Sequence, residues 1–122
     1  MSSKTRVANP SEIYDHHMAA FTDGDVSAML EDYTDDSVIL TNMGSFHGLE
    51  DIESLVTTYV EEFSKEGVEF EIDEQTVDGD VVFYAWHAET PDNVYDFGAD
   101  TLIVRDGAIE TQTSAVSVRP KR

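Results

Sequence analysis

The chain has 122 residues, the size of one domain, and carries 26 Asp or Glu against 7 Lys or Arg. Its formal net charge of −19 would repel nucleic acid and anionic membranes, and the absence of cysteine excludes disulfides, thiol catalysis and thiolate metal ligands. The acidic residues are spread along the chain rather than gathered in a tail. This favours a folded, halophilic protein with a hydrated anionic surface, and an ordinary acidic protein is the alternative.

The sequence lacks the segments that would direct a chain into or across a membrane. It has no apolar run of about 18 residues, so no transmembrane helix is expected. The start, MSSKTRVANPSE, has no apolar stretch typical of a secretory signal. We therefore expect a cytoplasmic protein, with a single domain over residues 10–118 and flexible termini at 1–9 and 119–122.

Helices are predicted in the first half of the chain. The first begins at Pro10, where Asn9 can cap it and Glu12 can complete a capping box, and it ends at Gly24. A short helix then follows Asp25 as its cap and ends near residue 33. A third helix stops at residue 67, and its apolar residues recur at helical spacing: Ile52, Leu55, Val56, Tyr59, Val60 and Phe63.

Strands make up the rest of the prediction. A short apolar strand, Ser37–Thr41, precedes a loop through Phe46 and His47. From Val68 onward the apolar residues alternate, and turns such as DG and TPDN separate four further strands. The fold class is α+β: a curved antiparallel sheet with helices on one face. Gly98, inside the long strand, marks a bulge or bend that would let the sheet curl.

The stretches FTDGDVSAMLEDYTDDSVI, GLEDIESLV and DTLIVRDGAIETQTS, in this order, resemble the nuclear transport factor 2-like superfamily. The closer likeness is to its SnoaL-like polyketide cyclases and ketosteroid isomerase-like proteins, over about residues 10–118. The resemblance implies a cone-shaped α+β barrel, a mostly apolar pocket at its open end, and a homodimer formed by the opposite sheet face. This fold hosts isomerases, dehydratases, hydrolases, cyclases and non-catalytic binders, so it does not by itself fix a function.

The resemblance also assigns roles to positions. In ketosteroid isomerases a carboxylate base at the end of the first strand moves a proton beside a carbonyl, while a tyrosine and a protonated aspartic acid hold the oxyanion. Here the base position falls on Thr41, which cannot act as a general base near neutral pH. The tyrosine position falls on His17, and the late-strand acid is retained as Asp100. The isomerase mechanism is therefore not expected unchanged.

A different acid–base set is predicted, in which His17, Asp100 and His87 are the catalytic candidates. His17 lies on the apolar face of the first helix, where an imidazole can titrate near neutral pH beside a carboxylate. Asp100 would orient it or donate as an acid of raised pKa. The resemblance places His87 on the concave side of its strand, and Tyr84 and Trp86 on the convex side, where Trp86 would suit a dimer interface. The expected ligand-binding residues are Tyr14, Thr41, Phe46, Tyr59, Phe63, Gln112 and Ser114.

Purely structural roles remain open for several of these residues. His17 can be a core histidine with a satisfied hydrogen bond, and Asp100 can cap a bulge or pair with Arg105. His47 can simply shape the loop before the third helix. His16 and His17 diverge by about 100° on a helix, so His16 should face solvent. No HxH or HExxH spacing occurs, and we expect neither a metal site nor a cofactor.

The sequence therefore leaves two functions open. The first is a SnoaL-like pocket enzyme, an isomerase, dehydratase, cyclase or hydrolase that acts by general acid–base chemistry on an apolar small molecule. The second is a non-catalytic small-molecule-binding or dimeric interaction domain, which the missing carboxylate at Thr41 favours. In both cases the expected partners are a small apolar ligand and a second copy of the chain, and neither nucleic acid nor a membrane.

Overall fold

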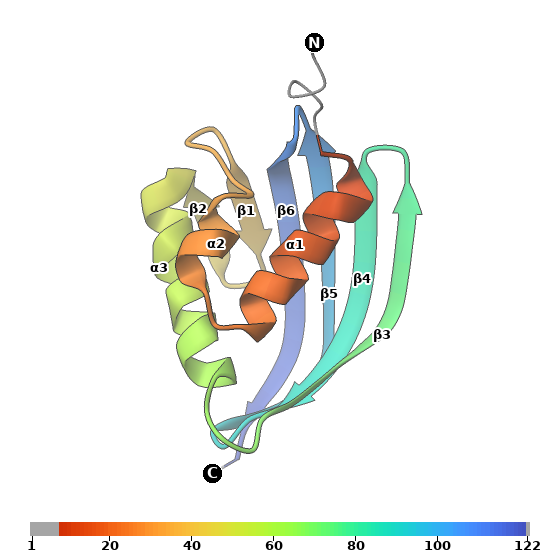
Figure 1. Ribbon diagram of the computed structural model, residues 1–122. Helices are drawn as coiled ribbons and strands as arrows, with labels where there is room; N and C mark the ends of the chain where they lie inside the picture. The colour runs from red at the N-terminus through yellow and green to blue at the C-terminus, as the bar shows by residue number, and fades with distance from the viewer. Residues whose placement is uncertain (1–7, 122) are drawn as a thin grey trace.

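The computed structural model describes residues 8–121, and its helices lie on one face of a single sheet (Figure 1). Of the flexible termini expected at residues 1–9 and 119–122, residues 1–7 and 122 lie outside this part of the chain. The helices are α1 (Pro10–Thr22), α2 (Val26–Leu30) and α3 (Gly48–Phe63). The strands are β1 (Val38–Thr41), β2 (Gly44–His47), β3 (Glu69–Asp78), β4 (Val81–Glu89), β5 (Asn93–Arg105) and β6 (Ala108–Pro120). None of the helices in residues 8–121 is long and apolar enough to cross a membrane.

The sheet has the strand order β2-β1-β6-β5-β4-β3. Strands β3 to β6 form the predicted antiparallel meander, and β1 pairs with β6 in parallel. The sheet curves around the helices but does not close, because β2 and β3 form its two edges (Figure 1). The predicted α+β class, a curved sheet wrapped around N-terminal helices, is confirmed in the form of an open half-barrel.

The predicted start signals of the helices are confirmed in atomic detail. The Asn9 side chain accepts a hydrogen bond from the backbone of Glu12 at 2.9 Å, and the Glu12 carboxylate accepts one from Asn9 at 3.0 Å. This reciprocal pair satisfies two backbone donors at the start of α1. At α2 the side chain of Asp25 is the cap, and it accepts a hydrogen bond from the backbone N–H of Ala28 at 3.0 Å.

The predicted loop after β1 is instead a β-hairpin. Strand β2 pairs with β1 in antiparallel register, from Thr41 opposite Gly44 to Val38 opposite His47. The Thr41 hydroxyl closes the turn by donating to the carbonyl of Gly44 at 3.0 Å and accepting from the backbone of Met43 at 2.9 Å. A second difference lies at the other end of the chain, where β6 runs to Pro120, beyond the expected domain boundary at residue 118.

Gly98 lies beside irregularities in the strand pairing of β5. The pairing register shifts between Tyr95 and Phe97 on β5, and Gly98 itself is paired with Trp86 on β4. A Cβ atom at position 98 would lie 2.2 Å from Cε2 of Trp86, closer than real atoms approach. The glycine therefore gives the indole room to lie flat on the concave face of the sheet, as well as lying beside the predicted irregularity.

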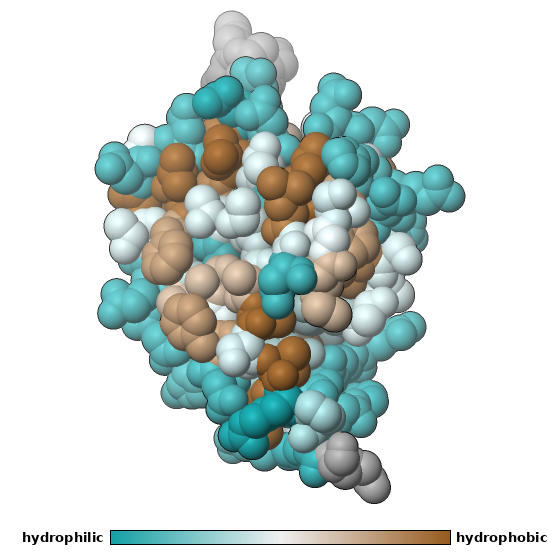
Figure 2. Space-filling model, turned by 180° about the vertical axis from the view of Figure 1, so that it is seen from behind, coloured by the Kyte–Doolittle hydropathy of each residue, from teal (hydrophilic) through white to brown (hydrophobic). Residues whose placement is uncertain are grey.

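The two faces of the sheet differ in chemistry. On the concave face, α3 buries Ile52, Val56 and Val60 against the sheet, and each such side chain contributes about 1.5–3 kcal/mol. The convex face, seen from behind, carries apolar side chains in its middle and hydrophilic ones around the rim (Figure 2). Leu40 and Phe83 are among its exposed apolar residues. The helices thus cover one side of the sheet and leave the other open.

Candidate functional site

A cavity of about 90 Å³ lies between the helices and the concave face of the sheet. Most of its wall is apolar, and residues from all three helices and from five strands contribute to it. A single water needs about 10–15 Å³, so this space can take several waters or a small organic molecule. The residues that bring polar atoms to the cavity wall are His17, Tyr33, Thr41, Tyr59, Tyr84, Trp86, Asp100, Gln112 and Ser114.

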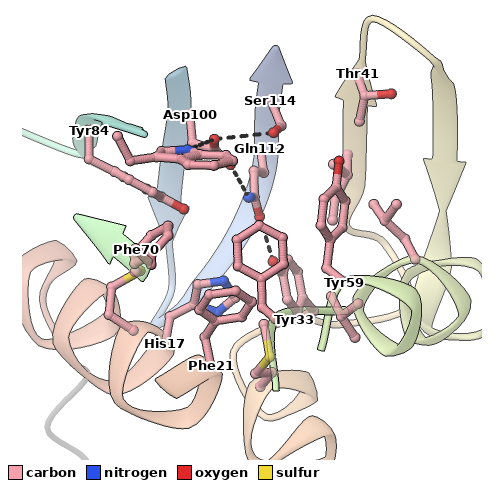
Figure 3. A pocket seen from close by; sticks show the side chains of 17 residues that line it. His17, Phe21, Tyr33, Thr41, Tyr59, Phe70, Tyr84, Asp100, Gln112 and Ser114 are labelled. Atoms are coloured by element: carbon pink, nitrogen blue, oxygen red, sulfur yellow. Dashed lines mark hydrogen bonds between the residues drawn. The ribbon is translucent and has the colours of Figure 1, made fainter. Parts of the chain in front are cut away.

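Asp100, on β5, is the centre of a hydrogen-bond network in the sheet wall (Figure 3). Trp86 Nε1 and Ser114 Oγ donate to its Oδ1 at 3.0 and 3.1 Å, and Gln112 Nε2 donates to its Oδ2 at 2.9 Å. The hydroxyl of Tyr33 in turn donates to Gln112 Oε1 and so fixes the orientation of the amide. Residues of β4, β5, β6 and the segment after α2 thus converge on one carboxyl group.

The burial of Asp100 controls its titration. Desolvation raises the pKa of this carboxyl above its ordinary value, although the hydrogen bonds from Trp86, Gln112 and Ser114 favour the charged form. Burial, followed by the nearby Asp100, raises the pKa of both Tyr33 and Tyr84 well above the usual value of a phenol. Both tyrosines therefore keep their hydroxyl protons at neutral pH and act as hydrogen-bond donors.

His17 enters the cavity from the helix layer, opposite the sheet (Figure 3). It is 4% exposed, and its ring meets that of Tyr33 edge-on with centroids 5.6 Å apart. Its Nδ1 lies 3.4 Å from Oδ2 of Asp32, in a geometry that makes no hydrogen bond among the described residues. The ring is therefore a buried imidazole with a carboxylate beside it, in place of the satisfied core histidine that was the alternative.

A cluster of aromatic rings lies in and beside the cavity wall. Phe63 of α3 lies 5.2 Å from Tyr95 and 6.2 Å from Trp86, and Phe70 of β3 lies 5.4 Å from Trp86, all between ring centroids. Edge-to-face and tilted contacts of this kind are each worth about 0.5–1.5 kcal/mol beyond burial. Phe63, Phe70 and Trp86 of this cluster line the cavity and make this part of its wall largely aromatic.

The prediction of which β4 side chains point to the concave face is wrong. Tyr84 and Trp86 line the cavity, whereas His87 is exposed and its imidazole bridges Asp73 at 2.9 Å and Glu71 at 3.3 Å on the outer surface. Successive side chains of a strand point to opposite faces, so an error of one residue reverses the whole strand. His87 therefore lies outside the cavity and cannot help His17, and Trp86 is not on the convex face.

Of the residues expected to bind a ligand, some line the cavity and others lie in the core. Thr41, Tyr59, Phe63, Gln112 and Ser114 line the cavity as expected. Tyr14 is instead buried behind the wall, with its ring edge-on to Tyr84 at 5.1 Å, because α1 turns this position toward the sheet. Phe46 lies on β2 and packs against the core from the side of the hairpin, outside the cavity.

Two of the structural alternatives are also decided by the contacts. Arg105 pairs with Asp80 and Glu110, at 3.7 and 3.4 Å, rather than with Asp100. His47 is the N-cap position of α3, and its backbone N–H donates to Asp51 at 3.1 Å. His47 thus belongs to the start of the helix, as the alternative for this residue supposed.

Sequence reasoning missed two residues of the site, Asp32 and Tyr33. Both are buried, at 3% and 5% exposure, directly after α2. In a chain with 26 acidic residues, a single buried aspartate gives no compositional signal. Tyr33 gave a usable signal, because a tyrosine shortly after a short helix is expected to pack against the same core as that helix.

The ligand atoms of Glu71, Asp73 and His87 lie within 4.8 Å of one another on the exposed surface of β3 and β4. These three groups already form ion pairs among themselves. The arrangement is therefore explained by side-chain pairing without an ion.

Comparisons with known proteins agree with the fold described above. Residues 14–111 match the family of SnoaL-like domains. Curated protein sequences give no match. Solved structures give many, including a nuclear transport factor 2-like protein of unknown function from Cytophaga hutchinsonii, with a TM-score of 0.75 at 10% identity over 93% of this chain and 94% of that chain.

Two further similar structures have names that refer to chemistry. One is a candidate ketosteroid isomerase from Kribbella flavida, with a TM-score of 0.71 at 12% identity over 86% of this chain and 75% of that chain. The other is a candidate polyketide cyclase from Sinorhizobium meliloti, with a TM-score of 0.69 at 19% identity over 84% and 92%. At such identities the likeness shows the fold. With the family match over most of its length, the chain belongs to the SnoaL-like domain family, with the nuclear transport factor 2-like fold.

Proposed function

We propose that this protein is a general acid–base enzyme acting on a small, mostly apolar molecule with one carbonyl or similar polar group. The observation that carries the proposal is the placement of His17: a buried imidazole in the wall of an apolar cavity, with a buried carboxylate 3.4 Å from its Nδ1. Isomerisation, dehydration, aldol-type cyclisation and hydrolysis are the reaction types that such a site can serve.

In this proposal Asp32 orients His17 and His17 moves the proton. A carboxylate beside Nδ1 favours the tautomer that carries its proton there. The lone pair of Nε2, on the opposite side of the ring, is then free to take a proton from a molecule in the cavity. Histidine is suited to this role because its charge changes near neutral pH.

Asp100 supplies the second polar centre of the proposed reaction. Burial raises its pKa and so widens the pH range in which the carboxyl group keeps a proton, and in that form it can donate to an oxygen where negative charge develops. Tyr84, also in the wall and protonated, is a further donor on the same side. A ketone held with its oxygen toward the sheet would present its α-carbon to the helix layer, where His17 lies.

A binding protein without chemistry is the second candidate. The observation that favours it is Thr41, which replaces the carboxylate base of ketosteroid isomerase-like relatives and whose hydroxyl is engaged in the β1–β2 turn. Both candidates place a small apolar ligand in the same cavity. They differ only in whether His17 exchanges a proton with it.

Deuterium exchange separates the two candidates. A small cyclic ketone, cyclohexanone, is incubated with the protein in D2O, and the loss of its α-proton signals is followed by NMR. His17→Asn should slow the exchange by about 10²- to 10⁴-fold, the usual contribution of a positioned acid–base group. His87→Asn is the matched control, because it removes an exposed imidazole that also contacts carboxylates but lies outside the cavity.

The same experiment can overturn the proposal. Exchange at the wild-type rate in His17→Asn, or an equal loss in His87→Asn, would remove His17 from the chemistry. If wild-type protein gives no exchange while cyclohexanone changes the fluorescence of Trp86, the only tryptophan, the binding function is favoured instead.

We further propose that two copies associate through the convex sheet face, in the cytoplasm of a cell with a high salt concentration. Paired residues across β4, β5, β6 and β1 share a face, and one such row is Phe83, Thr101, Thr113 and Leu40. A neighbouring row is Val81, Ile103, Thr111 and Val38. Neither row contains a charged residue, although the chain carries a net charge of −19. An uncharged area in the middle of this face is where two such chains can meet with least repulsion.

A further inference from the structure

Two adjacent histidines of α1 share one buried carboxylate. Nδ1 of His16 lies 2.8 and 3.0 Å from the two carboxylate oxygens of Asp32, and Nδ1 of His17 lies 3.4 Å from Oδ2 of the same group. The side chain of Asp32 is 4% exposed, that of His17 is 5% exposed and that of His16 is 44% exposed. One carboxylate therefore joins an imidazole in solvent to an imidazole in the cavity wall.

The surrounding fold holds the carboxylate in this position. Asp32 follows α2, and its backbone carbonyl accepts a hydrogen bond of 2.7 Å from Ile109 of β6. This contact ties the segment after α2 to the sheet, directly beside α1. Adjacent residues of a helix point about 100° apart, so only a group placed between their two directions can meet both rings. Asp32 occupies that place.

We propose that His16 is a positioning residue for His17. It keeps the Asp32 carboxylate in place by a hydrogen bond. Its own protonation state determines how strongly that carboxylate stabilises a proton on Nδ1 of His17. The inference rests on the proposed acid–base role of His17 for its functional meaning. Its physical content, the coupling of two imidazoles through one carboxylate, can be measured without any substrate.

The electrostatics give the direction of the coupling. While His16 is protonated, its charge compensates that of Asp32. When His16 loses its proton, the full charge of Asp32 acts on His17 and favours its Nδ1–H form, which leaves Nε2 free as a base. The cavity site is thus better prepared to accept a proton above the pH at which His16 titrates.

Several carboxylates decide where this pH lies. The hydrogen bond to Asp32 is the largest influence that raises the pKa of His16, and the charges of Asp32, Glu31 and Asp25 act in the same direction. Glu31 lies 3.6 Å from Nε2 of His16. Across the cavity, the group that faces His17 is Asp100. The transition is therefore expected above 6.5, the usual pKa of histidine.

The chain contains a matched control for this arrangement. Nδ1 of His87 lies 3.0 and 2.9 Å from the two oxygens of Asp73, and its Nε2 lies 3.3 Å from Glu71, almost the same contacts that His16 makes. The carboxylate of Asp73, however, is 46% exposed. His87 thus reproduces the surface pair without the connection to the cavity.

The experiment follows the imidazole resonances of the four histidines by NMR from about pH 5 to 9, in wild type and three variants. In the wild type, the ring of His17 should show an inflection at the pH where His16 titrates. His16→Asn keeps a donor at the place of Nδ1 but cannot titrate, so this inflection should disappear while the Nδ1–H form of His17 is retained. His16→Ala removes the donor too and should also change the resonances of His17 at every pH.

His87→Asn should leave the pH dependence of the His17 resonances as it is in the wild type. A His17 curve in His16→Asn that coincides with that of the wild type would overturn the proposal, because the two imidazoles would then titrate independently. An inflection lost equally in His87→Asn would overturn it as well, since the effect would come from the general surface charge. If ketone exchange is absent but the inflection behaves as expected, the coupling stands and only the catalytic role of His17 is lost.

Discussion

At the scale of residues, the site depends on how a few polar groups are satisfied in an apolar cavity. Asp100 receives hydrogen bonds from Trp86, Gln112 and Ser114, and burial still raises its pKa. Trp86 is the only tryptophan of the chain, so its fluorescence reports the state of this one carboxyl group. The structure thereby provides a direct probe of the protonation of Asp100.

We expect Trp86 fluorescence to change with pH as Asp100 titrates. Because the pKa of Asp100 is raised, its carboxyl group should gain a proton at a higher pH than an exposed aspartate, whose pKa is about 3.9. Asp100→Asn cannot titrate and should abolish the transition. Ser114→Ala removes a donor that favours the charged form, so it should move the midpoint to still higher pH, as followed by a fluorescence titration with circular dichroism to verify folding.

The account of Asp100 would be wrong if Asp100→Asn retained the wild-type transition. It would also fail if the wild-type midpoint lay at or below the value of an exposed aspartate, because burial would then not govern this group.

Individual residues differ in how far the sequence could predict them. The position of His17 and Asp100 in the cavity wall could be predicted because both lie at positions of the family pattern and on recognisable elements. Trp86 was assigned to the wrong face because β4 is apolar on both sides, and only its pairing with Gly98, where no Cβ blocks the indole, places it in the cavity. Asp32 was missed because the buried position of one acid depends on the tertiary contact between α1 and α2.

At the scale of elements, the cavity lies between the helix layer and the sheet, and side-chain contacts of α3 fix one layer to the other. Near its C-terminus, α3 offers Glu62, whose carboxylate accepts hydrogen bonds from Thr90 at 2.7 Å, Asn93 at 2.8 Å and Tyr95 at 2.8 Å. Hydrogen bonds to charged groups contribute about 1.5–3 kcal/mol each. This cluster fastens α3 to the β4–β5 connection, and Tyr95 in it lies beside the ring of Phe63.

The elements were predictable where a periodic pattern or a capping motif exists. The capping box of α1, the apolar face of α3 and the alternation of β3 to β6 all carry such signals. Strand β2 carries none: it has four residues, three of them exposed, and only its pairing with β1 defines it. The end of β6 was misplaced for a similar reason, because pairing with β5 extends it through Arg119 and Pro120, a charged residue and a proline that carry no strand signal.

At the scale of the whole molecule, the charge distribution determines where another macromolecule can bind. Two chains that each carry −19 repel one another, and molar salt reduces the Debye length to about 3 Å. The uncharged rows on the convex face provide the surface with least repulsion, and exposed Phe83, at 38%, lies in one of them. Composition predicts an acidic surface, but only the strand register shows which rows of the sheet lack charge.

We expect light scattering in molar KCl to give twice the chain mass of 13.6 kDa. Phe83→Glu places a charge on the convex face and should give a single chain. Ser54→Glu adds the same charge at an exposed position of α3 and should leave the dimer intact. A mass of one chain for the wild type, or a dimer that tolerates Phe83→Glu, would contradict an interface at this face.

The most direct measurement of the central claim is a crystal structure of the protein grown with cyclohexanone at a concentration that saturates the change in Trp86 fluorescence. The account predicts the ketone inside the cavity, with its oxygen within hydrogen-bond distance of the Asp100 side of the wall and an α-carbon next to Nε2 of His17. A ketone bound only outside the cavity, or bound inside with His17 turned away from it, would contradict the account.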